Sequence, residues 1–378
     1  MHEDKLTVAH LVSPYLFQTC SWIHTQLTHA HDARAIVLTH ALDHPERFPF
    51  EPIFHTSRNL SPLRRIRNKL LYLAGRFDPG LYLPVLREQR ASLIHAHMGW
   101  EGVRALPIAR AAALPLVTSF YGRDAGVLPR FPWWRLRFRQ LFKQGAAFFV
   151  EGPHLGQTLQ ALGCPAAKIH ILHLGIQTKR IPFARRAPGA DGSVEILVSA
   201  SMRSKKGVPA AVGAFAAMAS QFPKARLRIL GDGPQRMLVE ERIRRHRLNS
   251  RVTLEGYVSY ERHLQALERA HIFLAPSRTS PSGDTEGGAP VSIIEAQAAG
   301  LPIISTHHAD IPEVVEDGGS GLLSPEFDND ALARNLQWML EHPQHWPAMG
   351  RAGRERVERE FDADLQAKAA TVLYRSLI

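Results

Sequence analysis

The chain has 378 residues, 45% of them hydrophobic, which is enough for two domains with their own cores and excludes general disorder. Its two cysteines, Cys20 and Cys164, exclude a disulfide framework and a cysteine-based zinc site, and they suit a reducing compartment. A formal net charge of +11 favours anionic partners, whether nucleic acid, anionic lipid or phosphate-bearing substrates.

The first residues, MHEDKLTVAHLV, carry acidic side chains early and contain only a short apolar run. This pattern predicts a first β-strand rather than a signal peptide. The sequence has no stretch of about 18 apolar residues, so no membrane-spanning segment is expected. We therefore expect a cytoplasmic protein.

Short apolar runs alternate with Ala- and Leu-rich helical patterns along the first half of the chain, for example at 101–113 and 154–162. Alternation of strands and helices predicts a parallel sheet with helices on both faces. The strand candidates of this half are 6–12, 33–39, 92–97, 114–120, 146–150 and 168–175.

A second series of strands follows a segment rich in proline, glycine and charge, IPFARRAPGADGS at 181–193, which is typical of a linker. We expect an N-terminal domain over 1–180, a C-terminal domain over 194–360, and a helix over 361–378 that packs back on the first domain. The predicted fold is α/β, with two doubly wound domains facing each other across a cleft. The strand candidates of the second series are 194–201, 225–233, 251–257, 271–277 and 301–306.

The stretch DTEGGAPVSIIEAQAAGLP at 284–302 predicts an anion site at a helix start. Pro290 suits the first turn of a helix, and the small residues Gly287, Gly288 and Ala289 form the loop before it. Small residues let backbone amides approach a ligand closely, and the N-terminus of a helix favours negative charge. The loop therefore predicts a phosphate cradle.

Two glutamates bracket this loop. Glu295 lies about 7 Å further along the helix, where its carboxylate could accept hydrogen bonds from the hydroxyls of a ribose. Glu286, on the loop, could accept hydrogen bonds from a sugar on the other side. The alternative is a plain strand-to-helix turn, with Glu286 as a cap and Glu295 solvated.

Cations follow the first strand of the second domain in SASMRSKKGVPAA at 199–211. Ligands bind at the carboxyl ends of parallel strands, so Arg203 and Lys206 could neutralise a diphosphate leaving group. A solvated basic turn is the alternative.

A further glycine turn, LRILGDGPQR at 227–236, contains Gly231 and Gly233 and predicts a helix start at Pro234. It lacks the third glycine of a dinucleotide fingerprint, so we interpret it as a tight turn near a nucleotide.

Polar residues also follow two strands of the first domain, in HAHMGWEGVRA and TSFYGRDAG. We expect His97, Tyr121 and Asp124 to face the two glutamates across the cleft, although a single histidine is more often structural.

These motifs resemble the group 1 glycosyltransferases of family 4, which retain anomeric configuration and have the GT-B fold. TEGGAPVSIIEAQAAGLPIIST is similar to the family signature, and SASMRSKKGV, LRILGDGP and ADIPEVVEDGGSGLL follow the family order. IHAHMGWEGVRA is similar to its acceptor side, and SPYLFQTCSWIHTQL resembles members that build bacterial surface polysaccharides, such as colanic-acid transferases.

The resemblance implies a transfer of sugar from a nucleotide-diphosphate sugar to an acceptor hydroxyl. It implies that Glu295 binds the ribose, that Glu286 and its loop hold the sugar, and that Arg203 and Lys206 bind the diphosphate. Eight residues separate the glutamates where the family usually has seven, so Glu286 matches with a one-residue shift. Tyr121 stands where many members have histidine.

No cofactor or metal is required for this chemistry, because positioned cations can stabilise the leaving phosphate. The Asp-x-Asp pairs, Asp328-Asn-Asp330 and Asp362-Ala-Asp364, precede helical patterns and are expected to cap helices rather than bind metal.

Two basic segments of the first domain suggest a membrane surface. Residues 58–76 carry six cations and no acid, with four aliphatic residues at helical spacing, and residues 130–143 carry five cations and five aromatic residues. This mixture suits docking to anionic lipid and a lipid-linked acceptor, whereas no nucleic-acid-binding module is present in the sequence. An ordinary solvated basic face is the alternative.

Two other functional classes remain open at this stage. One is a nucleotide-sugar isomerase of the 2-epimerase type on the same architecture. The other is a non-catalytic sugar-nucleotide binder.

Overall fold

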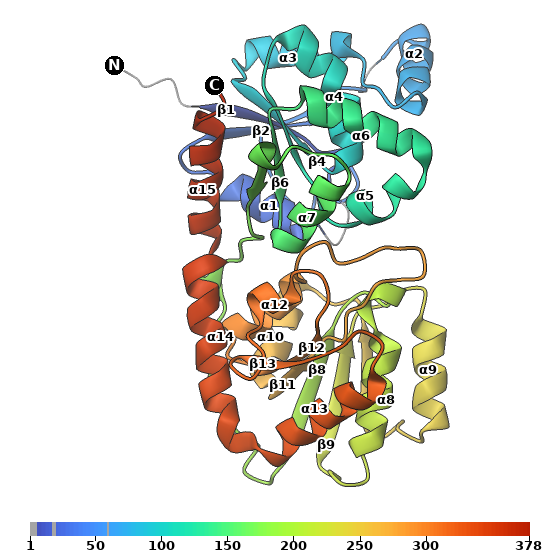
Figure 1. Cartoon of the computed structure of the whole chain (residues 1–378), viewed down its shortest axis with the longest axis vertical. Coiled ribbons are helices and arrows are strands. Elements are labelled where there is room, and N and C mark those ends of the chain that lie inside the picture. The colour runs from blue at the N-terminus through green and yellow to red at the C-terminus, as the bar shows by residue number, and fades with distance from the viewer. Residues whose placement is uncertain (1–5, 17–19, 59) are drawn as a thin grey trace. The chain divides into compact units, whose positions relative to one another are not determined.

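The computed structural model describes residues 6–16, 20–58 and 60–378. The chain folds into two compact units (Figure 1). The first contains the described residues up to Gly175 together with Ala363–Ile378, and the second contains Ile176–Asp362. The division falls after Gly175, and residues 181–193 lie in the second unit.

The first unit is built on a parallel sheet with the strand order β3-β2-β1-β4-β5-β6-β7 in the described residues. Successive residues of β1 contact different hydrophobic clusters, Val8 on one face and Ala9 on the other. Both faces of the sheet are therefore buried, as the continuous apolar runs predict. The strands are β1 (Thr7–Leu11), β2 (Arg34–Thr39), β3 (Ile53–His55), β4 (Leu93–His97), β5 (Leu116–Ser119), β6 (Ala147–Val150) and β7 (Ile169–Ile171).

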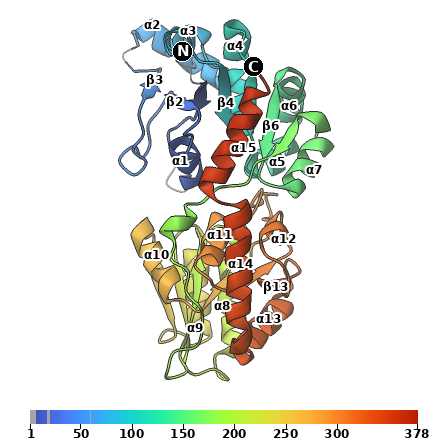
Figure 2. The same ribbon diagram turned by 90° about the vertical axis from the view of Figure 1, so that its left-hand side faces the viewer.

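The helices of this unit pack on the two faces of its sheet. Ala370 and Tyr374 of the last helix, α15, share a hydrophobic cluster with Val8 and Phe149 (Figure 2). The helices are α1 (Ser21–Thr28), α2 (Pro62–Leu73), α3 (Pro79–Glu88), α4 (Gly99–Ala112), α5 (Arg123–Gly126), α6 (Pro132–Gln144), α7 (Pro153–Ala161) and α15 (Ala363–Arg375).

The second unit has its own parallel sheet, with the order β10-β9-β8-β11-β12-β13 in the described residues. Ile196 and Leu197, neighbours on β8, are both fully buried, so helices cover both faces here too. The strands are β8 (Val194–Ser199), β9 (Ala225–Leu230), β10 (Val252–Gly256), β11 (Ile272–Leu274), β12 (Ile303–Thr306) and β13 (Gly321–Ser324). The helices are α8 (Val208–Met218), α9 (Arg236–Arg245), α10 (Tyr260–Arg269), α11 (Val291–Ala298), α12 (Ile311–Val314), α13 (Asn329–Glu341) and α14 (Trp346–Glu360).

These sheets confirm the predicted α/β class with two Rossmann-like units. In each, the strand order reverses beside the first strand, β1 or β8, which is the point where such folds bind ligands at the carboxyl ends of their strands.

Local details differ from the expectations. The prediction of a helix start at Pro234 is wrong, because α9 begins at Arg236 and Pro234 lies in the preceding turn. Pro290 is the N-cap of α11 rather than its first residue. The edge strands β3 and β13 were not predicted, because each has only two adjacent apolar residues, beside proline or glycine.

Three further expectations concern a helix cap, the two cysteines and membrane-spanning helices. Asp328 caps α13, since its carboxylate accepts a hydrogen bond from the backbone N–H of Ala331. Cys20 and Cys164 are both buried, and no disulfide joins them. Among the described residues, no helix is both long and apolar enough to cross a membrane.

The segment 181–193 forms no helix or strand and is tied to the second unit by Arg186. This buried guanidinium donates hydrogen bonds to the carbonyls of Glu268, Ala270 and Ala299. Burial lowers the pKa of Arg186 to about 10, because desolvation disfavours the charged guanidinium. The hydrogen bonds to the three carbonyls compensate for this desolvation.

Candidate active site

A partly buried ion pair joins two of the predicted catalytic residues of the second unit. Lys206 Nζ lies 2.6 Å from Glu286 Oε2, although the residues are 80 positions apart. The hydroxyl of Ser277 donates to the other carboxylate oxygen at 2.7 Å. The basic turn after β8 and the glycine loop before α11 therefore meet at one point, at the carboxyl end of the sheet.

The charge of Glu286 is maintained by its neighbours. Burial alone would raise the pKa of its carboxyl group, but the ammonium groups of Lys206 and Lys205 outweigh it. The resulting pKa lies below the ordinary value, so the group is an anion at neutral pH. An anion with a fixed orientation is suited to accept hydrogen bonds from sugar hydroxyls.

The same loop is anchored from two further sides. Lys205 donates to the Asp284 carboxylate at 3.2 Å and to the Thr285 carbonyl at 2.7 Å. On the other side, the backbone N–H of Glu286 donates to His308 Nε2 at 3.1 Å.

His308 links this loop to a second acidic residue, Glu326. Its Nε2 accepts a hydrogen bond and carries no proton, so Nδ1 carries the proton and donates to Glu326 at 2.6 Å. Glu326 in turn accepts from the backbone N–H of Thr279. The loop that carries Glu286 is thus part of a continuous polar network.

Glycines allow the close approach of the loops around the basic turn. Gly207 has φ +63°, and a Cβ there would lie 1.9 Å from the carbonyl oxygen of Pro276. A Cβ at Gly231, with φ +120°, would lie 2.0 Å from the carbonyl oxygen of Ala200, and Gly233 packs against Met202. Gly231 and Gly233 therefore position the segment that leads to Lys206.

Glu295 lies in the second turn of α11 and is buried, so the alternative of a solvated glutamate is wrong. His263 Nε2 of α10 lies 2.9 Å from its carboxylate, and His263 Nδ1 lies 3.0 Å from the hydroxyl of Ser199 at the end of β8. Burial and the nearby Glu295 carboxylate raise the pKa of the Tyr260 hydroxyl. The contacts of His263 hold the Glu295 carboxylate in one orientation.

The remaining predicted residues of this unit lie around the same helix start. Gly287, with φ +88°, Gly288, Ala289 and Pro290 are all buried in the loop before α11. Arg203 is exposed and caps the short 3₁₀ turn Ser204–Lys206.

In the first unit, the three predicted residues form a linked structure. His97 Nδ1 lies 2.7 Å from the hydroxyl of Tyr121. Asp124 accepts hydrogen bonds from the backbone N–H groups of Gly99, Tyr121 and Ala125. Because its carboxylate is engaged by these amides, Asp124 fixes the starts of α4 and α5.

A pocket of the first unit opens at the carboxyl ends of β5, β6 and β7. Tyr121 lines it, together with Trp22 and Gln26 of α1, Glu151 after β6, and Gln366 of α15. His97 and Asp124 lie behind this wall, each bonded to Tyr121.

Sequence reasoning missed the residues that support the site: Ser277, His308, His263 and Tyr260. Ser277 and His308 directly follow β11 and β12, so their position after a parallel strand was an available signal. His263 belongs to the apolar face of α10, and nothing in the local sequence distinguishes it from a core residue.

The chain is similar to known glycosyltransferases in sequence and to solved structures in fold. Residues 181–356 match the family described as glycosyl transferases group 1, and residues 25–180 match glycosyltransferase family 4. WcaL of Escherichia coli (strain K12), named for colanic acid biosynthesis, is 32% identical over 293 residues, covering 76% of this chain and 71% of that protein. The amylovoran biosynthesis glycosyltransferase AmsK of Erwinia amylovora is 31% identical over 274 residues, covering 72% and 67%.

Solved structures share the fold of the whole chain. A sucrose-phosphate synthase from Thermosynechococcus elongatus superposes with a TM-score of 0.76 at 19% identity, covering 98% of this chain and 99% of that one. HepE of Anabaena, solved with UDP and glucose, gives 0.76 at 16% identity and covers 98% and 100%. The two Rossmann-like units therefore correspond to the GT-B architecture that the motifs predict.

Proposed function

The chain belongs to the group 1 glycosyltransferases, and from this premise we propose that it transfers a sugar from a nucleotide-diphosphate sugar to an acceptor hydroxyl with retention of configuration. Its relatives WcaL and AmsK are named for polysaccharide biosynthesis. We place the activity in the assembly of a bacterial surface polysaccharide.

The observation that carries this proposal is the Lys206–Glu286 pair beside the start of α11, with Glu295 inside the same helix. A donor bound along the line from Glu295 through Lys206 to Glu286 would contact three different groups in order. Glu295 accepts hydrogen bonds from the ribose, Lys206 and the helix N-terminus receive the diphosphate, and Glu286 accepts hydrogen bonds from the sugar. Arg203 adds a second cation from the same turn.

In the proposed reaction the bond between the anomeric carbon and the diphosphate oxygen breaks, and a bond to the acceptor oxygen forms on the same face. The acceptor proton passes to the departing phosphate. Lys206 and Arg203 stabilise the negative charge that develops on the diphosphate, which is the main demand of this step. Glu286 is held by Lys206 and Ser277 and acts as a positioning group for the sugar.

The test is a panel of nucleotide-sugars incubated with the protein, with and without a lipid-extract acceptor. We expect nucleoside diphosphate to be released with one donor and only in the presence of the acceptor. NMR of the product should show the anomeric configuration of the donor. A changed nucleotide-sugar without diphosphate release would instead identify an isomerase, and tight binding without any product would identify a non-catalytic binder.

We further propose that the acceptor is lipid-linked and that the pocket lined by Tyr121 and Glu151 receives its sugar. The support is helix α2, which lies in the same unit. None of the residues of α2, a fully described helix, is buried. Its apolar stripe of Leu63, Ile66, Leu70 and Leu73 is between 58% and 82% exposed.

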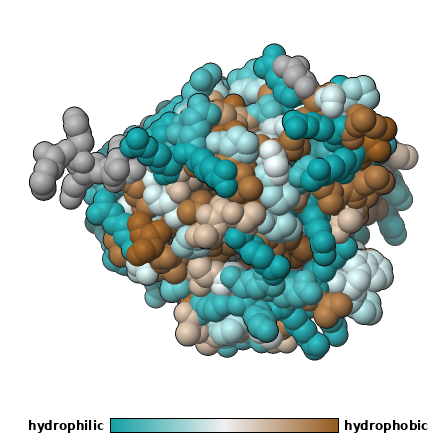
Figure 3. Space-filling model, turned by 90° about the horizontal axis from the view of Figure 1, so that it is seen from above, coloured by the Kyte–Doolittle hydropathy of each residue, from teal (hydrophilic) through white to brown (hydrophobic). Residues whose placement is uncertain are grey.

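Basic residues lie on the same helix as this apolar stripe. We therefore propose that α2 binds an anionic bilayer. Arg64, Arg65, Arg67 and Lys69 lie on the same helix. At the C-terminal end of α2, Arg137 of α6 donates to the carbonyl of Ala74, so α6 continues the surface. Phe131, Trp133 and Leu136 are exposed there. Figure 3 shows hydrophobic side chains reaching the surface among hydrophilic ones at this end of the molecule.

Neutralising Arg64 and Arg65 together (R64Q/R65Q) should weaken binding to anionic vesicles about 30-fold, at about 1 kcal/mol for each cation near the surface. Replacing Ile66 and Leu70 by serine should weaken it further, because two apolar side chains no longer enter the bilayer. The measurement is sedimentation with vesicles of phosphatidylglycerol against phosphatidylcholine.

The matched control is Met237→Ser, which removes an even more exposed apolar side chain from α9 of the second unit. It should leave vesicle binding unchanged. Equal binding of the native protein to anionic and neutral vesicles would contradict the docking proposal.

A further inference from the structure

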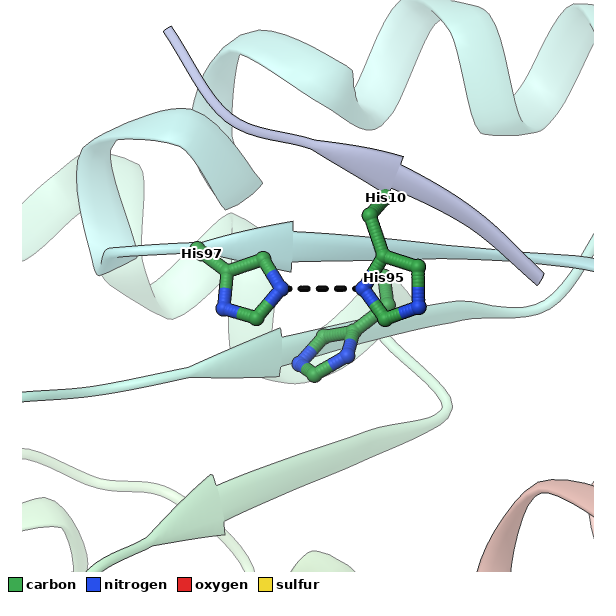
Figure 4. A group of neighbouring side chains, drawn as sticks. All are labelled: His10, His95 and His97. Carbon is green, nitrogen blue, oxygen red and sulfur yellow. Dashed lines mark hydrogen bonds between the residues drawn. The ribbon is translucent and has the colours of Figure 1, made fainter. Parts of the chain in front are cut away.

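Three histidines of the first unit gather on one face of its sheet. His10 of β1 is paired in register with His95 of β4, and His97 follows two residues later on the same strand. Side chains two residues apart point to the same face of a strand, so all three imidazoles project together. All three side chains are buried, and Figure 4 shows their rings grouped between the neighbouring strands.

The spacing of the ring nitrogens fits a common metal ion. His10 Nδ1 lies 3.0 Å from His97 Nε2, and one nitrogen from each of the three rings lies within 4.8 Å of the others. Around a tetrahedral zinc ion with bonds of about 2.0–2.1 Å, neighbouring nitrogens are separated by about 3.4 Å. Small changes of side-chain torsion bring the three nitrogens to this spacing.

Hydroxyl groups orient the outer side of the rings. The hydroxyl of Tyr121 lies 2.7 Å from His97 Nδ1. Both nitrogens of His95 have a hydroxyl neighbour, Ser119 at 2.7 Å from Nε2 and Tyr374 at 2.8 Å from Nδ1, so a metal ion on His95 would displace one of these two hydroxyls. Metal-binding histidines characteristically donate their second ring N–H to such an outer partner, which fixes the tautomer. When Nδ1 of His97 carries the proton, the lone pair on its Nε2 points toward His10.

We propose that His10, His95 and His97 form a binding site for a single divalent transition-metal ion, with zinc as the best match. Neutral imidazole nitrogen favours zinc over magnesium or calcium, which prefer oxygen. Three histidines leave a fourth position for a water molecule or a neighbouring hydroxyl. Two buried carboxylates near Tyr121 would balance the positive charge of the ion. Asp124 accepts a hydrogen bond from the backbone N–H of Tyr121, and both Asp124 and Glu151 act electrostatically on Tyr121.

The ion would stabilise the first unit and would take no part in the sugar transfer. It would join β1 to β4 directly. Through Tyr121 it would also fix one wall of the pocket. The proposal is independent of the donor site in the second unit.

The experiment uses the full-length chain without a polyhistidine tag, stripped with a chelator and then titrated with zinc chloride. We expect one equivalent of zinc to remain after gel filtration and the Tm to rise with zinc concentration, because the ion binds the folded state. X-ray absorption of the zinc-loaded native protein should show three imidazole ligands, and cobalt substitution should give the visible spectrum of a tetrahedral site.

The variants His10→Asn and His95→Gln should each lose the stoichiometric zinc and the increase in Tm. The matched control is His345→Gln, because His342 and His345 form a second histidine pair near Trp338 in the other unit. The His345→Gln variant should keep both the bound zinc and the increase in Tm. No retained zinc in the native protein, an absorption spectrum without imidazole ligands, or loss of zinc only in His345→Gln would each overturn the proposal and leave a hydrogen-bonded cluster of histidines.

Discussion

Replacing Lys206 by methionine will lower kcat/KM for sugar transfer by about 10²- to 10³-fold, the loss that follows removal of one charge-stabilising donor from an active site. Lys206 is the cation that contacts Glu286 at the carboxyl end of the sheet, so both the developing charge on the diphosphate and the orientation of Glu286 depend on it. The measurement is initial-rate kinetics with the donor identified by the panel.

The variant also leaves a buried carboxylate without its partner, which lowers stability as well as activity. A second variant, K206M/E286Q, separates the two effects, because it removes the charge of the stranded carboxylate. Its Tm should recover towards the native value while its activity stays low. The matched control is Lys224→Met, which removes a surface lysine of the same unit that is bonded to the carbonyl of Asp191. If K206M kept most of its activity at native Tm, Lys206 would have no part in the reaction.

Replacing Glu295 by glutamine will weaken donor binding by about 10- to 150-fold, since hydrogen bonds to a charged group contribute about 1.5–3 kcal/mol. The carboxylate is already held by His263, so the ribose meets an acceptor that needs no reorganisation. The measurement is the dissociation constant of the nucleoside diphosphate by calorimetry.

The decisive comparison pairs this variant with donors that lack one ribose hydroxyl. The native protein should bind the 2′-deoxy or 3′-deoxy nucleotide more weakly, and Glu295→Gln should lose most of this discrimination, because the two changes remove the same interaction. Glu341→Gln is the matched control, a glutamate of α13 that is bonded to Gln337 at the surface. Equal discrimination by native protein and variant would show that Glu295 does not bind the ribose.

The fold was predictable because both sheets are parallel and buried on both faces. Such strands appear in the sequence as short apolar runs between helical patterns, and the long ones, such as β1 and β8, were placed within a residue or two. The edge strands β3 and β13 were not, because each has only two adjacent apolar residues beside proline or glycine. The equally short β7 and β11 lie within longer apolar runs, so they were predicted.

The site was predictable residue by residue but not as a set of contacts. Lys206 and Glu286 were each selected by their place beside a strand or helix end, but their contact depends on β8 and β11 being neighbours in the sheet. The support of Glu295 by His263 depends on the packing of α10, which no local pattern expresses. In the same way, the three histidines meet only because β1 and β4 are paired, so His97 could not be linked with His10 in advance.

The central claim is that the donor lies along the line from Glu295 through Lys206 to Glu286. A crystal structure of the protein with the nucleotide-sugar selected by the panel tests this most directly. Our account predicts the ribose hydroxyls on the Glu295 carboxylate, the diphosphate against Lys206 and the start of α11, and the sugar within hydrogen-bonding distance of Glu286. A nucleotide bound elsewhere in the second unit, with the Lys206–Glu286 pair untouched, would contradict it.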